Sequence, residues 1–234
     1  MLEEVALLRM DWVDVVFAHW PVDPAVVADR LPPGLTVDTC DGRAWLSVVA
    51  FRMQDAGPTP SVFAPFRRSF PELNLRTYVS GVVGRPATDP GIYFFSLETP
   101  DRLAVRVARA TTGLPYFDAD LAMDVTDEAI HVESERTHRG QPRARFDATV
   151  TPGDPVDGDD RARFLTERYR FYATVAGRLV VGSVRHDPWH LQRATLDLRT
   201  NDLFAAAGFD APPGDPLVHY AQHASVVAGP VLPA

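Results

Sequence analysis

The chain has 234 residues, of which 46% are hydrophobic, and this is enough apolar material for a substantial core. Its 23 basic side chains are all arginine, and its 31 acids give a net charge of −8, which disfavours nonspecific binding to nucleic acid or to an anionic membrane. Because lysine is absent, no side chain can form an imine with a carbonyl substrate or with pyridoxal phosphate.

A single cysteine, Cys40, excludes an intrachain disulfide. The N-terminus lacks the basic start and apolar run of a signal peptide, and no apolar run approaches the length of a membrane span. We therefore expect a cytoplasmic protein that forms one domain over residues 1–234, needs no cofactor or metal, and takes a small molecule as its partner. A homo-oligomer stays open. The Asp-rich, lysine-free composition is typical of a salt-adapted (halophilic) or GC-rich source, and composition does not separate the two.

The first half of the chain alternates strand patterns with two helix patterns. Strands are expected at 12–20, 35–40, 43–54, 72–80 and 91–97. Helices are expected at 24–31, which follows the Asp23-Pro24 start signal, and at 101–112, which ends at Gly113. The turn Asp41-Gly42 predicts that strands 35–40 and 43–54 form a hairpin. Loops are expected at 55–69 and 81–91.

The second half is again dominated by strands. After an extended link at 114–117, we expect three short strands within 118–151, an acidic loop at 153–160, a helix at 160–168, a hairpin of 169–175 and 178–185 across Ala176-Gly177, a strand at 191–199, a short helix at 201–207 and a last strand at 217–228. The fold class is therefore mainly β with a few short helices. The natural architecture is a large swollen β-barrel or a folded-over antiparallel sheet.

Strand 72–80 is the stretch around which the rest is organised, and we expect it to be central rather than at an edge. Four polar side chains share one of its faces, and the other face is apolar or small. The polar row consists of Glu72, Asn74, Arg76 and Tyr78. If this row faces water, the strand is an ordinary half-buried one; if it faces an enclosed cavity, it is a binding site.

Seven short sequence phrases, taken together and in order, resemble the YqjF-like family of uncharacterised proteins. Their residues are most similar to those of haloarchaeal members. They span roughly residues 12 to 200: FAHWPV from Phe17, LPPGL from Leu31, FPELNLRTYV from Phe70, YFFSL from Tyr93, LPY from Leu114, LTERY from Leu165 and HDPW from His186.

The resemblance implies the acetoacetate decarboxylase-like fold, a swollen β-barrel with a buried, polar-lined cavity. Acetoacetate decarboxylase works through a lysine imine, which this chain cannot form. The resemblance therefore carries over the barrel and a carboxylate-binding arginine, but not the decarboxylase chemistry.

Arg76 is the first candidate for substrate binding, since its planar fork suits a carboxylate or an enolate oxygen. Glu72, with its pKa raised by burial, is a candidate acid or base. Asn74 and Tyr78 from the same row, and Tyr116 from the LPY phrase, join them as substrate-binding candidates. The alternative is a structural Arg–Glu network, because buried charges must be paired whatever their use.

Glu167 and Arg168 form a second candidate substrate-binding cluster, for which a structural ion pair is the competing interpretation. Arg109 is a further substrate-binding candidate; it and Arg136 either line the cavity or pair with Glu135 and with aspartates.

His186, which stands beside Asp187 and Trp189, is the second candidate for proton transfer, although such a turn often needs a histidine hydrogen bond to hold its shape. His19 lies on an apolar strand face, where a histidine is more often a satisfied core group than a catalyst.

Metal-binding and nucleophile patterns are weak. The pairs His186/His190 and His219/His223 are four residues apart, but neither lies in a convincing helix. Cys40 precedes an Asp-Gly turn and lacks an adjacent base, and Ser47 and Ser96 lack the nucleophile-elbow motif.

Two classes of function remain. The first is a lysine-independent enzyme that acts on a small carbonyl or carboxylate compound in a barrel cavity. The second is a non-catalytic barrel that binds a small ligand. Only the first requires an acid or base poised in the cavity.

Overall fold

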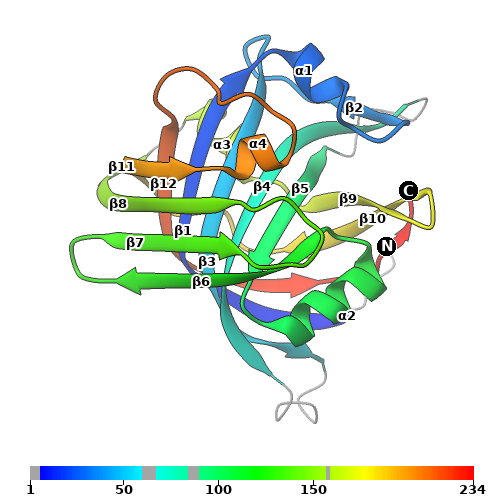
Figure 1. Ribbon diagram of the computed structural model, residues 1–234, viewed down its shortest axis with the longest axis horizontal. Helices are drawn as coiled ribbons and strands as arrows, with labels where there is room; N and C mark the ends of the chain where they lie inside the picture. Colours follow the sequence, from blue (N-terminus) through cyan, green and yellow to red (C-terminus); the bar gives the residue numbers. More distant parts are fainter. Residues whose placement is uncertain (1–5, 60–66, 84–89, 157–158) are drawn as a thin grey trace.

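The computed structural model describes residues 6–59, 67–83, 90–156 and 159–234, and all statements below concern these ranges. The described part of the chain contains thirteen strands and four helices (Figure 1). The strands are β1 (Leu8–Val22), β2 (Leu35–Val37), β3 (Ala44–Pro58), β4 (Arg68–Val82), β5 (Gly91–Thr99), β6 (Tyr116–Val125), β7 (Ile130–Arg136), β8 (Arg145–Pro155), β9 (Arg170–Val175), β10 (Arg178–Arg185), β11 (Leu191–Asn201), β12 (Leu217–Ala228) and β13 (Leu232–Pro233). The helices are α1 (Pro24–Ala28), α2 (Arg102–Thr112), α3 (Asp160–Thr166) and α4 (Leu203–Ala206).

Nine of the strands close into a barrel, which confirms the mainly β fold class. They follow the order β5-β6-β7-β8-β11-β12-β1-β3-β4, and the pairing of β4 with β5 closes the ring. The sheet is mixed rather than wholly antiparallel, because β5 pairs in parallel with both β6 and β9. Strand β4 pairs with β3, β5 and β2, so the predicted central position of the 72–80 stretch is confirmed.

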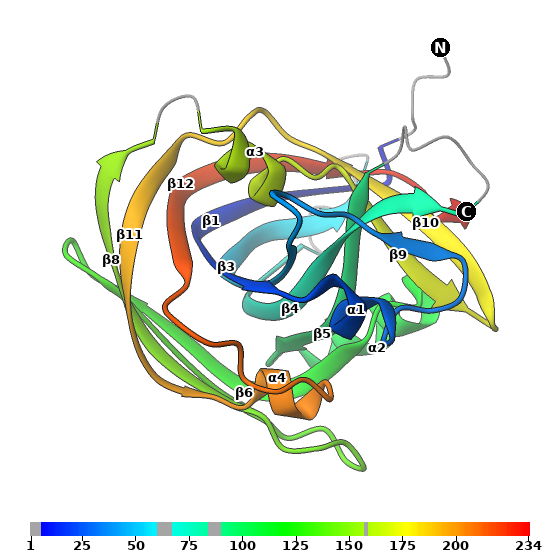
Figure 2. The same cartoon turned by 90° about the horizontal axis from the view of Figure 1, so that it is seen from above.

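The sheet divides at two strands, β5 and β12. The start of β5 pairs with β9 and its end with β6. In the same way, β12 pairs first with β11 and then, near its end, with β10. The hairpin of β9 and β10 therefore connects β5 to β12 by a second, shorter route. Seen from above, β8 and β11 lie on one side of β1, β3 and β4, while β9 and β10 lie on the other (Figure 2). We call β12, β1, β3, β4 and β5 the shared wall.

The main hydrophobic core fills the interior of the nine-stranded ring. It joins the shared wall to β7 and β8 opposite, through side chains that include Val16, Leu75, Val132, Phe146 and Val150. Leu73 and Leu75 place the apolar face of β4 in this core. The polar row of β4 therefore lies on the opposite face of the shared wall, toward α3 and the β9–β10 hairpin.

Local signals in the sequence explain most of the element boundaries. The Asp101 carboxylate caps α2 by accepting hydrogen bonds from the backbone of Leu103 and Ala104, each at 3.0 Å, and Gly113 ends the helix with φ of 71°. Ala176 and Gly177 both have positive φ, 48° and 76°, which is the type I′ turn that a two-residue hairpin requires.

One predicted pairing is wrong. The predicted strand 35–40 is β2, which covers only Leu35–Val37 and pairs with β4 rather than with β3. The Asp41-Gly42 turn exists, but it joins only the isolated bridge of Cys40 and Arg43, because β2 and β3 both pair with successive stretches of β4 rather than with each other.

Three predicted loops fall partly outside the described residues, namely the stretches 60–66, 84–89 and 157–158. The described parts of these loops mostly extend neighbouring strands: β3 runs to Pro58, β4 begins at Arg68 and β8 continues to Pro155. None of the described helices has the length and apolar character that crossing a membrane requires.

The β9–β10 turn offers a test of the hairpin that covers the polar row. Ala176 is an exposed non-glycine residue in the left-handed region, so Ala176→Asn, which creates the favoured Asn-Gly turn, is expected to raise the free energy of unfolding by about 1 kcal/mol. Urea unfolding measures the change. Ala122→Asn, at an exposed position inside β6, is the matched control and should give no gain. A stability loss in Ala176→Asn would contradict the turn geometry.

Candidate functional site

The predicted polar row on β4 is buried along its whole length. The exposed fraction is 3% for Glu72, 2% for Asn74, 8% for Arg76 and 0% for Tyr78. Burial of four polar side chains in one line is costly unless each finds a partner. The contacts of each therefore decide what the row can do.

The register of the sheet places other polar side chains beside this row. His19 on β1 is paired with Ser47 on β3, and Ser47 is paired in turn with Arg76 on β4. All three lie on one face of the shared wall, abreast of one another, with neighbouring strands about 4.8 Å apart. Ser47 is the small member between two larger ones.

The Arg76 guanidinium has few polar partners for a buried charge. Its Nη2 donates a hydrogen bond to the Leu165 carbonyl of α3 at 3.3 Å, and its Nε has no hydrogen-bond partner among the described residues. Its Cζ lies 5.6 Å from the centre of the Phe17 ring and 5.9 Å from that of Tyr78. In the described part of the chain, no carboxylate forms an ion pair with it, so the predicted Arg76–Glu72 salt bridge is not made.

Glu72 lies at the start of the row, on the far side of Asn74 from Arg76, and both of its oxygens are hydrogen bonded. Tyr116 donates its hydroxyl to Oε2 at 2.6 Å, and the Asn74 amide donates to Oε1 at 3.2 Å. Burial raises the pKa of Glu72 to about 7, although these two hydrogen bonds and Arg76 favour the charged form. Burial, together with neighbouring Glu72, holds the pKa of Tyr116 well above its ordinary value, so Tyr116 stays a donor.

Tyr78 begins a buried hydrogen-bonded chain. Its hydroxyl lies 2.7 Å from the Leu165 carbonyl and 2.7 Å from Ser47 Oγ, and Ser47 Oγ lies 2.6 Å from His19 Nδ1. The chain thus joins α3 to three strands of the shared wall.

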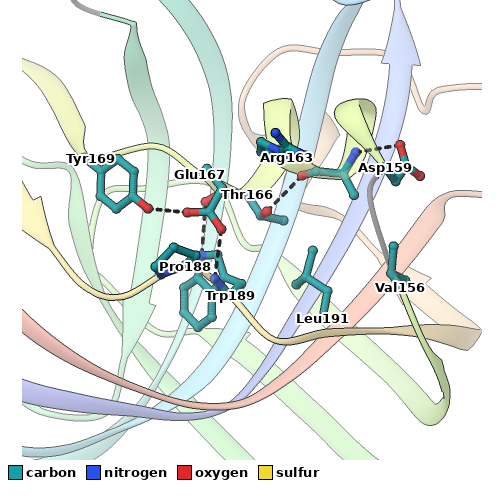
Figure 3. A pocket seen from close by; sticks show the side chains of 10 residues that line it. Val156, Asp159, Arg163, Thr166, Glu167, Tyr169, Pro188, Trp189 and Leu191 are labelled. Carbon is teal, nitrogen blue, oxygen red and sulfur yellow. Dashed lines mark hydrogen bonds between the residues drawn. The ribbon is translucent and has the colours of Figure 1, made fainter.

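A groove of about 520 Å³ lies close to the polar face, between α3 and the segment before β11 (Figure 3). Trp189 lines it and places its ring edge-on to Phe17, with 5.3 Å between ring centres, so one aromatic layer separates the groove from Arg76. The Glu167 carboxylate accepts hydrogen bonds from the Tyr169 hydroxyl and, at 2.8 Å, from the Trp189 backbone (Figure 3). Glu167 therefore holds the groove wall in place.

Arg168 and Arg109 do not join the polar row. Arg168 is buried, forms an ion pair with Asp38 at 2.8 Å and donates to the Phe164 carbonyl, so its charge is already used. Arg109 is exposed on α2, where it donates to the Tyr116 carbonyl at 2.8 Å. Its contact supports the backbone that presents Tyr116 to Glu72.

His186 stands in an aromatic cluster, not beside Glu72. Its ring lies 4.6 Å from that of Trp189 and 4.9 Å from that of Tyr169, measured between centres, and its Nδ1 contacts the Asp187 carbonyl at 2.8 Å. These contacts are those of a residue that shapes its turn.

Two arrangements of buried polar groups are not predicted from the sequence: the proximity of His219 to His19 and the ion pair of Glu98 with Arg136. His219 on β12 lies 5.5 Å from His19 between ring centres, and its Nδ1 has no partner among the described residues. Glu98, which is fully buried, pairs with Arg136 on the ring side of the sheet, whereas the predicted partner Glu135 pairs with exposed Arg143. Neither is marked by a motif, because each depends on which strands become neighbours.

No group of three or more His, Cys, Asp or Glu residues in the described ranges is arranged to hold a metal ion. His219 is buried and His223 is exposed beside Asp11, so this spaced pair does not converge.

Comparison with known structures supports the fold. The chain is similar to the enduracididine biosynthesis enzyme MppR complexed with pyruvate, with a TM-score of 0.69 and 16% identity over 99% of this chain and 91% of that one. It is also similar to acetoacetate decarboxylase from Legionella pneumophila, with a TM-score of 0.64 and 14% identity over 97% of this chain and 88% of that one. At these identities the likeness concerns the fold, which is acetoacetate decarboxylase-like as the sequence resemblance implied.

Sequence comparison gives the family. The chain is 39% identical over 228 residues to the uncharacterized protein YqjF of Bacillus subtilis (strain 168), which covers 96% of this chain and 91% of that protein. Residues 9–225 match the model of DUF2071, a family of uncharacterized conserved proteins. The chain therefore belongs to the DUF2071 family and is YqjF-like.

Proposed function

We propose that this protein binds a small carboxylic acid against the Arg76 guanidinium and catalyses proton transfer on it without an imine. The observation that carries the proposal is a buried arginine with no carboxylate partner in the described chain. Removing a charge from water costs several kcal/mol unless a counter-charge compensates it. An anionic ligand would complete the pairing that the protein leaves open.

The proposed chemistry follows from Glu72, the first residue of the row. A carboxyl group with a pKa of about 7 exchanges its proton readily at neutral pH. As a carboxylate, Glu72 takes a proton from the carbon beside a carbonyl group, and the electron pair of that C–H bond moves to the carbonyl oxygen as an enolate. Return of the proton reverses the step, so no other reactant is needed.

Arg76 and the network around it supply the electrophilic side of this reaction. A guanidinium binds a carboxylate with two parallel hydrogen bonds and stabilises negative charge that develops nearby. Because the chain has no lysine, the negative charge must be stabilised in this way rather than by an imine.

A structural relative supports the choice of ligand class. MppR, which shares the fold, has been crystallised with pyruvate and with the condensation product of pyruvate and imidazole 4-carboxaldehyde. Those ligands belong to MppR, and they show that this fold accommodates small keto acids.

A non-catalytic ligand-binding barrel is the second candidate. It is favoured by the Glu72 carboxylate, whose two oxygens are already hydrogen bonded to Tyr116 and Asn74. Binding without turnover at any pH would select it. For either function we propose a cytoplasmic setting, in keeping with the single free cysteine, and a salt-adapted, haloarchaeal-type source, in keeping with the Asp-rich, lysine-free composition.

The first test is ligand-dependent stability. Acetate, propionate and pyruvate are expected to raise the melting temperature of the wild type, since a ligand at 100 times its Kd adds about 2.7 kcal/mol. Arg76→Met is expected to abolish this gain and to raise the ligand-free stability by about 1 kcal/mol or more, because it removes an unpaired buried charge. Arg76→Lys should also lose the ligand-dependent rise in melting temperature, since lysine lacks the planar guanidinium that binds a carboxylate with two hydrogen bonds.

Arg106→Met is the matched control for this test, because Arg106 is exposed on α2. It should keep the full ligand effect. No stabilisation by any acid, or equal stabilisation in folded Arg76→Met, would overturn the binding proposal.

The second test is the pH dependence of stability. The pKa of Glu72 is about 7 in the folded state and 4.5 in the unfolded state. The contribution of this group to the free energy of unfolding is therefore fully present below pH 4.5 and is lost as the pH rises to about 7. The loss is about 3 kcal/mol as an order of magnitude. Glu72→Gln should remove it, so the stability of the variant relative to wild type should rise across this window and level off above it. If the difference in stability between Glu72→Gln and the wild type does not change with pH, the pKa of Glu72 is not raised in the folded state.

The third test is turnover. The methyl protons of pyruvate should exchange with deuterium in the presence of the protein, at a rate that increases with pH through about 7 as Glu72 becomes a base. Glu72→Gln should slow the exchange at least about 100-fold. Borohydride added with substrate should leave the activity intact, because no imine forms. Unchanged exchange in Glu72→Gln would exclude Glu72 as the base, and inactivation by borohydride would contradict the imine-free mechanism.

A further inference from the structure

The direction of each hydrogen bond in the Tyr78 chain follows from a count of protons. A carbonyl oxygen cannot donate, so the 2.7 Å contact of Tyr78 with the Leu165 carbonyl uses the single hydroxyl proton of Tyr78. The Tyr78 oxygen can then only accept, and Ser47 must donate across their 2.7 Å contact.

The same count fixes the tautomer of His19. The one hydroxyl proton of Ser47 points to Tyr78, so the 2.6 Å contact of Ser47 Oγ with His19 Nδ1 requires a proton on Nδ1. Burial, His219 and Arg76 all hold the pKa of His19 well below its ordinary value, so the ring is neutral at neutral pH. A neutral imidazole with a proton on Nδ1 carries a lone pair on Nε2.

This lone pair has no partner. His19 is fully buried, with 0% exposure, and Nε2 makes no hydrogen bond to any described residue. A buried acceptor without a donor is a rare and costly arrangement, which points to a group that completes it.

The position of His19 relative to Arg76 identifies that group. The two residues flank Ser47 in one row across β1, β3 and β4, and Arg76 acts electrostatically on His19. Arg76 presents hydrogen-bond donors, including its unpaired Nε, while His19 presents an acceptor. A ligand that satisfies both carries an anionic oxygen and, close to it, a hydroxyl group.

We infer that the acid bound beside Arg76 bears a hydroxyl on the carbon next to its carboxylate, and that this hydroxyl donates to His19 Nε2. The ligand class is a small 2-hydroxy acid or the enol form of a 2-keto acid. This inference rests on the proposed function and adds the substrate class. A keto oxygen would meet the Nε2 lone pair with a lone pair of its own, so the site disfavours the keto form and stabilises the enol.

The experiment compares lactate with propionate, which differs only by lacking the hydroxyl, and with pyruvate. The wild type is expected to bind lactate about tenfold more tightly than propionate or pyruvate, as measured by thermal-shift titration or calorimetry. His19→Asn places an amide nitrogen where Nδ1 stood and so preserves the bond to Ser47, but it removes the Nε2 acceptor. This variant should bind propionate as the wild type does and lose the preference for lactate.

His190→Asn is the matched control, since His190 is exposed, and it should keep the preference. Equal binding of lactate and propionate by the wild type, with both still dependent on Arg76, would overturn this inference while leaving the proposed function intact. Absence of binding by all three acids would overturn both. If His19→Asn fails to fold, nitrogen-15 NMR of the wild-type histidines decides: a proton on His19 Nδ1, with an Nε2 signal that shifts on addition of lactate but not propionate, supports the inference, and a proton on Nε2 overturns it.

Discussion

The structure depends on one constraint, namely that the central stretches of the shared wall are buried on both faces. Strands β12, β1, β3, β4 and β5 belong at once to the nine-stranded ring and to the shorter circuit through β9 and β10. In these central stretches, the strands have no face left for water. Each buried polar side chain there must therefore be satisfied by a neighbour in the protein or by a ligand.

The two faces of the wall meet this constraint differently. The ring side is filled by aliphatic and aromatic side chains, and its fully buried Glu98 is paired with buried Arg136. The opposite side carries Arg76 and His19, each of which has a buried nitrogen without a hydrogen-bond partner among the described residues. In the proposed function, the groups that bind and react therefore lie on one face of the same five strands, and the main hydrophobic core lies on the other.

Much of the fold could be predicted because its signals are local. Alternation identified β4, and Ala176-Gly177 identified the hairpin of β9 and β10. The Asp41-Gly42 turn failed as a hairpin signal because the pairing of β2 is decided by β4, which lies far away in sequence. Turn chemistry specifies the reversal of the chain and not the partner that each strand then finds.

The candidate site, like the fold, could be predicted only where local sequence signals mark its residues. Alternation predicts that the polar row belongs to the candidate site, and the LPY phrase predicts the same for Tyr116. The row across His19, Ser47 and Arg76 was not predicted, because it runs perpendicular to the strands and depends on register between residues 28 and 29 positions apart. The side-chain chemistry of Glu167, Arg168 and His186 also predicts site residues, but the contacts that these side chains make are structural.

The division of the sheet at β5 and β12 has an evolutionary consequence. The hairpin of β9 and β10 is joined to each of these strands by only two residue pairs, whereas β1, within the wall itself, has long pairings with β3 and β12. Mutations in the hairpin, in α3 or in the Trp189 segment therefore alter what covers the polar face at little expense to the ring. Under the proposed function, a family built in this way can change its ligand by remodelling the cover, while the wall that carries Glu72, Arg76 and His19 is inherited unchanged.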